Sequence, residues 1–170
     1  SEQSYNGVDR AVIVTGGGPG IMEAANRGAF DAGARSVGFN ITLEHEQMPN
    51  SYVAPELAYR FRYFALRKMH FLLRAVGLVA FPGGLGTADE VYETLQLVQS
   101  GKMVRIPIVL VGREFWQSTL PLGWLAEQDV VDAADVTLPT VVDTGLEAWR
   151  VIQDFYRERG GIAGSPLKEQ

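Results

Sequence analysis

LVAFPGGLGTADEVYETLQLVQSGK, residues 78–102, is the stretch that decides the fold. Its first four residues, Leu78 to Phe81, form an apolar run between a glycine and a proline, which is typical of a strand buried on both faces. A glycine-rich turn follows at once, and apolar residues at helical spacing then continue as far as Gly101. The stretch therefore predicts a strand, a tight turn and a helix, in that order.

The turn between this strand and helix has the features of a phosphate-binding loop. Gly83, Gly84 and Gly86 are expected to allow positive φ angles and to leave no Cβ in the way of a ligand. The helix is expected to begin at Thr87, which stands at capping-box spacing from Glu90. Free N–H groups and the positive end of the helix dipole would then face an anion in the loop. Tight packing of strand on helix is the alternative explanation of such glycines.

The residues after the glycines are more specific. Pro82 to Glu90 reads PGGLGTADE, which resembles the PGGxGTxxE motif of the LONELY GUY family, whose members are often described as possible lysine decarboxylases. The family's Arg-Lys pair is matched by Arg67-Lys68, and its first glycine motif by GGGPGIME at 16–23. The resemblance covers residues 12–155 and implies hydrolysis of a nucleoside 5′-monophosphate at its N-glycosidic bond, but it does not specify the base.

The resemblance also implies the residues of the site. Glu90 and Arg67 are expected to be catalytic. An ionised carboxylate beneath the sugar would stabilise the positive charge that develops as the bond breaks, and the start of a helix favours the charged form of Glu90. Arg67 would orient the sugar or its phosphate. The other expected substrate or phosphate contacts are Gly17, Gly18, Met22, Glu23, Lys68, Gly83, Gly84, Gly86 and Thr87.

Three of these residues also have a simpler explanation. Glu90 could be nothing more than the reciprocal half of a capping box. Glu23 lies in the first turn of its helix, where the helix dipole favours any acid. Lys68 is expected either to help form the pocket or to pair with an acid. These alternatives remain open at the level of the sequence.

The composition is that of an ordinary globular domain. The chain has 170 residues, 46% of them hydrophobic and 21% charged, and a formal net charge of −5. This charge argues against a nucleic-acid groove, and the absence of cysteine excludes disulfides and thiolate chemistry. No apolar run approaches the about 20 residues of a membrane span, and no signal peptide precedes the first predicted strand. We therefore expect a cytoplasmic protein with no nucleic-acid or membrane partner.

Strands and helices are expected to alternate along the chain. We predict strands at 11–15, 36–40, 57–63, 78–81, 106–111 and 136–138, and helices at 21–32, 65–76, 87–101, within 114–127, and from 144 to 159. This order predicts an α/β fold: a single domain over 1–170, with a Rossmann-like, doubly wound parallel sheet between two layers of helices. Residues 1–10 would be a lead-in and 160–170 a tail. Family members usually begin with a further strand and helix carrying a Gly-Ser turn, which ten residues cannot supply, so that element either lies outside the given residues or is absent from a degenerate member of the family.

Positive charge is concentrated before the second glycine turn. Residues 57–88 contain no acid but five cations, in a chain of net charge −5. Pairing with the acids of 42–56 is one explanation. A bound phosphomonoester is the other, because arginine holds phosphate through two parallel hydrogen bonds. The five cations are Arg60, Arg62, Arg67, Lys68 and Arg74.

Cofactor and metal chemistry are not expected. The first glycine turn is half of a dinucleotide fingerprint, but the acid that should follow about 20 residues later is replaced by Asn40. None of the three lysines has a recognisable setting for pyridoxal phosphate, which true lysine decarboxylation needs. His45 lies in a segment, 42–55, that is expected to be a flexible flap or crossing, and no second histidine stands at ligand spacing. We therefore predict no cofactor and no metal.

A non-catalytic nucleotide sensor or carrier is the main alternative to an enzyme, because the same cradle can bind without cleaving. A structural or oligomer-forming module is another, although it leaves the basic segment unexplained. The resemblance also implies a homodimer, and Phe71 and His70 make the predicted helix at 65–76 our candidate for the contact, since both lie off its core stripe. That predicted stripe is Leu66, Met69, Leu73 and Val76.

Overall fold

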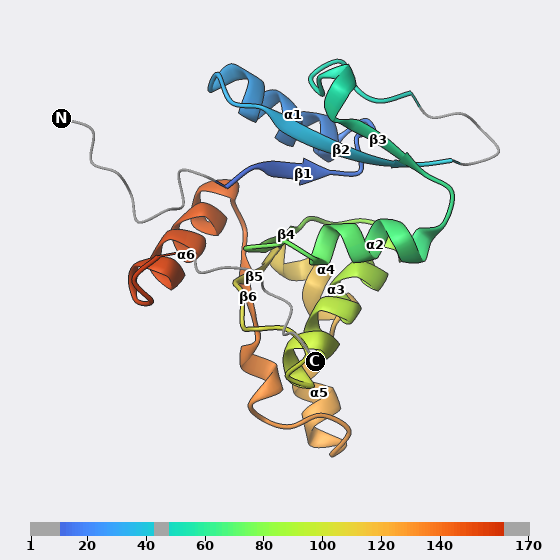
Figure 1. Cartoon of the computed structure of the whole chain (residues 1–170). Helices are drawn as coiled ribbons and strands as arrows, with labels where there is room; N and C mark the ends of the chain where they lie inside the picture. Colours follow the sequence, from blue (N-terminus) through green and yellow to red (C-terminus); the bar gives the residue numbers. More distant parts are fainter. Residues whose placement is uncertain (1–10, 43–47, 162–170) are drawn as a thin grey trace. The chain divides into compact units, whose positions relative to one another are not determined.

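The computed structural model describes residues 11–42 and 48–161 (Figure 1). The predicted lead-in, most of the predicted tail and His45 lie outside these residues. The chain divides into two compact units, an N-terminal unit that ends at Leu73 and a C-terminal unit that begins at Arg74. The single domain over 1–170 stays a prediction.

The N-terminal unit contains a three-stranded parallel sheet in the order β1-β2-β3. Its register pairs Val14 with Val37 and Phe39 with Tyr59. The elements of this unit are β1 (Ile13–Thr15), α1 (Ile21–Asp31), β2 (Ser36–Ile41), the 3-10 turn η2 (Pro55–Leu57), β3 (Ala58–Phe61) and α2 (Phe64–Leu72).

Helices α1 and α2 cover opposite faces of this sheet. Successive side chains of a strand point to opposite faces, so Ser36 and Phe39 of β2, three residues apart, face different ways. The hydroxyl of Ser36 accepts a hydrogen bond from Asn26 of α1, whereas the ring of Phe39 packs edge-on against Phe71 of α2. Figure 1 shows the two helices on either side of the sheet accordingly.

The alternation predicted for 57–63 is confirmed within β3. The rings of Tyr59 and Phe61 both contact the ring of Phe39, with centroids 5.8 and 5.4 Å apart, so both lie on the face that carries α2. Arg60, between them, belongs to the opposite face.

The buried face of α2 differs from the predicted stripe. Leu66 and Met69, which were predicted to be core residues, are 47% and 46% exposed. Phe71, predicted to lie off the core, has its ring centroid 5.1 Å from that of Phe39. The prediction was wrong because the face of the sheet beneath α2 is aromatic. An aromatic ring buries about 150–250 Å², so the aromatic side of α2 gains most by facing it.

The C-terminal unit contains a second three-stranded parallel sheet, in the order β4-β5-β6. Its strands and helices alternate as the sequence indicates. The elements are β4 (Leu78–Ala80), α3 (Leu85–Gln99), β5 (Ile108–Val111), α4 (Arg113–Thr119), α5 (Leu122–Glu127), the 3-10 turn η3 (Asp135–Thr137), β6 (Pro139–Val142) and α6 (Gly145–Arg157).

The predicted last strand, at 136–138, was wrong. The strand begins at Pro139, and the preceding residues form the 3-10 turn η3. Two short-range hydrogen bonds hold this turn: the Thr137 hydroxyl donates to Ala134 O at 2.8 Å, and the Asp132 N–H donates to a carboxylate oxygen of Asp135 at 3.0 Å. Such local side-chain bonds compete with strand pairing, which explains the later start of β6.

Helices cover both faces of the second sheet as well. In the central strand β5 every residue is buried, as predicted: Ile108 and Leu110 pack with residues of α3 and α4, and Val109 and Val111 pack with Ala148 of α6. The edge strand β4 is less enclosed, with Val79 36% exposed, so burial on both faces is only partly confirmed there. Parallel strands with helices on both faces confirm the α/β, Rossmann-like arrangement.

The described helices are short compared with a membrane span. The longest of them, α3, has 15 residues. Within 11–42 and 48–161, none is both long enough and apolar enough to cross a lipid bilayer.

Candidate functional site

The first glycine turn, at 16–20, joins the carboxyl end of β1 to the start of α1. Gly17 and Gly20 have φ angles of 71° and 72°, in the left-handed region that favours glycine. The Gly17 N–H donates to the hydroxyl of Thr15 at 2.9 Å. A Cβ on Gly17 would also lie 3.4 Å from the Cα of Gly38 in β2. Two glycines therefore meet where the turn packs against the sheet.

Arg67 of α2 lies beside this turn. A Cβ built on Gly16 would be 3.7 Å from Nη1 of Arg67 and 2.8 Å from the sulfur of Met22. The guanidinium carbon lies 5.7 and 5.6 Å from the ring centroids of Phe64 and Phe71, within the range of cation–π attraction. The N-terminal unit thus brings two predicted site residues, Met22 and Arg67, to the first glycine turn, with the arginine held by aromatic rings.

Two further predicted residues lie close in sequence to this group. Glu23 is half-buried in the first turn of α1, a position that fits both a ligand contact and a dipole-favoured acid. Lys68 follows Arg67 in α2 and is half-buried. Of the acids in 42–56, Glu56 pairs with Arg35 at 2.9 Å. Glu56 therefore pairs with a cation that lies outside the basic segment at 57–88.

The second glycine turn begins its helix earlier than predicted. Helix α3 starts at Leu85, with Gly84 as its N-cap and no side-chain cap. The amides of Thr87 and Ala88 both donate to Gly84 O at 3.1 Å, which closes the first turn of the helix on the glycine. The predicted capping box was therefore wrong, and Glu90 is the sixth residue of α3, in its second turn. The structural explanation of Glu90 as a cap no longer applies.

The three glycines of this turn serve different purposes. None of them has a positive φ angle, contrary to the prediction. Gly83 is needed for close packing, because a Cβ there would lie 2.4 Å from Oγ1 of Thr87. At Gly84 and Gly86 a Cβ would meet no atom of its own unit within 4 Å. Glycine inside a helix costs about 0.5–1 kcal/mol relative to alanine. The choice of glycine at position 86 therefore has no structural explanation within the C-terminal unit.

Two main-chain amides at the start of α3 have no acceptor within the helix. The first residues of a helix have no intrahelical acceptor for their N–H groups, and here these residues are Leu85 and Gly86. The side chain of Leu85 is 90% exposed. Sequence reasoning missed Leu85 because the family motif leaves this position variable. The amide of Thr87 is already bonded to Gly84 O at 3.1 Å, so the ligand contact predicted for Thr87 is left to its hydroxyl.

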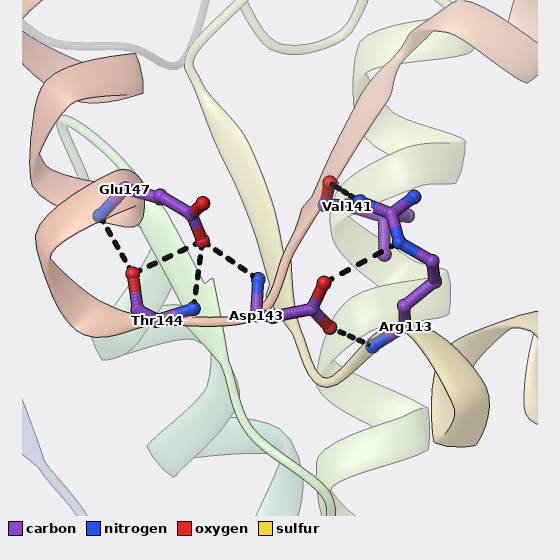
Figure 2. Close-up of polar contacts among 5 residues, drawn as sticks. All are labelled: Arg113, Val141, Asp143, Thr144 and Glu147. Atoms are coloured by element: carbon purple, nitrogen blue, oxygen red, sulfur yellow. Dashed lines mark hydrogen bonds and ion pairs between the residues drawn. The ribbon is translucent and has the colours of Figure 1, made fainter.

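A polar cluster stabilises the carboxyl ends of β5 and β6, the sheet edge from which the second glycine turn also leaves (Figure 2). Asp143 accepts a hydrogen bond from the Arg113 N–H at 2.9 Å, and its other oxygen lies 3.4 Å from Arg113 Nε. Thr144 and Glu147 form the capping box that the sequence predicts for α6. Hydrogen bonds from the Asp143 N–H, the Thr144 hydroxyl and the Thr144 N–H lower the pKa of Glu147.

Parallel strands that end in glycine turns, each leading into a helix N-terminus, define an α/β protein of the Rossmann-like class. A family model described as "possible lysine decarboxylase" matches residues 22–152. The chain therefore belongs to this family, which is the family of the LONELY GUY proteins. The match begins at Met22, just after the first glycine turn. A comparison with curated proteins found no significant match.

Proposed function

We propose that the protein hydrolyses the N-glycosidic bond of purine nucleoside 5′-monophosphates, releasing the free base and ribose 5-phosphate. The observation that supports this proposal is the open space at Gly86. Any side chain at this position would lie next to the amides of Leu85 and Gly86 at the start of α3. Such amides, with the positive end of the helix dipole, favour a phosphate group. Adenine and N6-substituted, cytokinin-type adenines are the candidate bases.

Glu90 is the proposed electrostatic group. As the C1′–N bond breaks, its electron pair leaves with the base and positive charge develops on the sugar, which a carboxylate stabilises. The oxygen of a water molecule then bonds to C1′, one proton of that water passes to the departing base, and the other stays on the new hydroxyl group of the sugar. Arg67 is proposed to orient the sugar or its phosphate. Glu90 belongs to the C-terminal unit and Arg67 to the N-terminal unit, and each role is proposed on its own.

The direct test is to incubate the protein with AMP and, in parallel, with adenosine, and to separate the products by chromatography. We expect adenine to be released from AMP and far more slowly from adenosine, because the amides of the second turn have no anion to hold in the nucleoside. Comparable rates would contradict the proposal. Binding of AMP without release of adenine would instead identify a nucleotide sensor or carrier. A panel of other purine monophosphates then identifies the base.

Glu90→Gln tests the catalytic role. The structure places Glu90 outside any cap, so we expect the variant to melt near the wild-type temperature and to bind AMP. Removing a well-placed electrostatic group commonly slows a reaction by about 10²-fold to 10³-fold. Asp89→Asn is the matched control, since it removes the same charge from the neighbouring, exposed residue of α3. Equal rates for Glu90→Gln and the wild type would show that the carboxylate has no part in the chemistry.

We also propose that the protein forms a homodimer, in keeping with the two-fold symmetry of most small assemblies. The contact through α2 stays a prediction. Phe71 packs against Phe39, and the ring of His70 lies 5.2 Å from that of Phe61, so both contribute to the N-terminal unit itself. The exposed Leu66 on the same helix is the better candidate. Light scattering that shows a monomer at micromolar concentration would contradict the dimer.

A further inference from the structure

A buried polar network lies against the first glycine turn. Asn26 of α1 is 0% exposed. Its Oδ1 accepts hydrogen bonds from the Thr15 hydroxyl at 2.8 Å and from Nδ2 of Asn50 at 2.9 Å, and its own Nδ2 donates to the Ser36 hydroxyl at 2.9 Å. Both polar atoms of this buried side chain are therefore hydrogen-bonded, as burial requires. The network joins β1, α1, β2 and the segment that contains Asn50.

Asn50 connects the network to the turn itself. Its Nδ2 donates toward Gly17 O at 3.2 Å and Gly18 O at 3.0 Å, and its main-chain N–H donates to Gly17 O at 2.8 Å. Its Oδ1 accepts from the Tyr52 N–H at 3.2 Å, which holds the amide group in this orientation. The segment at 42–55 was predicted to be a flexible flap or crossing. Its described part is fastened to a turn 33 residues earlier in the chain.

The hydrogen bonds to Gly17 O determine where the next amide points. A peptide group is planar and trans, so its N–H points opposite to its C=O. The carbonyl of Gly17 shares its peptide group with the N–H of Gly18, and the following residue, Pro19, has no N–H. Asn50 therefore directs the Gly18 N–H away from the network. Among the described residues, this N–H has no protein acceptor.

We propose that Asn50, oriented by Asn26, is a positioning residue of the nucleotide site: it holds the first glycine turn in the conformation that presents the Gly18 N–H to the phosphate of the ligand. The choice of a nucleoside monophosphate as ligand rests on the proposed function. Neither asparagine belongs to the residues that the family motifs indicated. If their role were only structural, their loss would lower stability without a specific effect on ligand binding.

The variant Asn50→Ala removes the amide group and keeps the main-chain N–H. We expect the dissociation constant and the KM for AMP to rise by about 10-fold to 10²-fold, the scale of a small misplacement of a binding group. The kcat at saturating AMP should fall by a smaller factor, because the removed amide group does not touch the reacting atoms. Binding is measured by titration calorimetry, kinetics by release of adenine, and folding by circular dichroism.

Tyr156→Phe is the control for lost stability. It removes one side-chain hydrogen bond to a main-chain carbonyl, from the Tyr156 hydroxyl to Val76 O, in a helix without predicted site residues. We expect a lower melting temperature and an unchanged KM. Should Asn50→Ala fail to fold, Asn50→Ser serves in the same comparison with a smaller expected rise in KM.

The outcomes separate this inference from the proposed function. A wild-type KM and dissociation constant in a folded Asn50 variant would overturn the positioning role and leave the hydrolase intact. If the wild type binds AMP without cleaving it, the hydrolase is wrong, and weaker binding by Asn50→Ala still supports the positioning role. If the wild type binds no AMP at all, both are overturned.

Discussion

Replacing Gly86 with alanine is predicted to stabilise the fold and, at the same time, to weaken the binding of AMP. Gly86 is the second residue of α3, and a Cβ there would meet no atom of its own unit within 4 Å. Its φ angle lies outside the left-handed region, so alanine fits the helix without strain. The substitution also restricts the unfolded chain, which favours the folded state.

The two expected effects have opposite signs and measurable sizes. Alanine in place of glycine at a compatible position stabilises a protein by about 0.4–1 kcal/mol. In a chain of this size 1 kcal/mol shifts the melting temperature by about 2–4 °C, so a rise of about 1–4 °C is expected. A hydrogen bond to a charged group contributes about 1.5–3 kcal/mol. If the new methyl group displaces the phosphate from one amide, the dissociation constant rises by about 10-fold to 10²-fold.

The chain offers a closely matched control. Gly123 is likewise the second residue of its helix, α5, and a Cβ there would also meet no atom of its own unit within 4 Å. Gly123→Ala should give a similar rise in melting temperature and leave the dissociation constant for AMP unchanged. Thermal melts followed by circular dichroism and titration calorimetry with AMP measure both quantities.

Two results would refute this reasoning. If Gly86→Ala bound AMP as tightly as the wild type, the space beside the helix N-terminus would not be a phosphate site. If the variant melted at a lower temperature than the wild type while Gly123→Ala melted at a higher one, the space at Gly86 would already be filled in the native protein.

Gly83→Ala should destabilise the protein by about 1–3 kcal/mol, the usual range for overpacking, because the new Cβ would lie 2.4 Å from Oγ1 of Thr87; urea unfolding measures this, and wild-type stability would contradict the close approach. Glu147→Gln should remove a pH-dependent contribution to stability. The folded state lowers the pKa of Glu147 below its ordinary value of 4.5, so its charge stabilises the fold above that pH and the benefit is lost as the pH falls through the folded pKa. Urea unfolding should therefore show a larger difference from wild type at pH 7 than at pH 3, and equal differences at both would argue against the charge.

Several features were predictable because they depend on residues close together in sequence. The central strand β5 is a short apolar run and is buried throughout, and Thr144 and Glu147 stand at capping-box spacing and form the box. Together with the alternation of strands and helices, these local patterns were enough for the α/β class and the family.

The start of α3 shows where a local pattern misled. Thr87 and Glu90 have the spacing of a capping box, but the carbonyl of Gly84 accepts two amide hydrogen bonds and starts the helix earlier. In the sequence, Gly84 and Thr87 are both acceptable N-cap residues. The main-chain hydrogen bonds to Gly84 O make Gly84 the N-cap. The same hydrogen bonds place Glu90 in the second turn and make Leu85 the first residue of the helix.

The amino-acid sequence by itself determined the glycine motifs and the alternation of strands and helices, because each of these depends on neighbours within about one helical turn or one strand. Only the tertiary structure decided that α2 buries its aromatic side, that Arg67 lies beside Gly16, and that Asn50 holds the first glycine turn. These contacts join residues that are far apart in the chain. Their partners are settled by which segments pack together, and no local pattern carries that information.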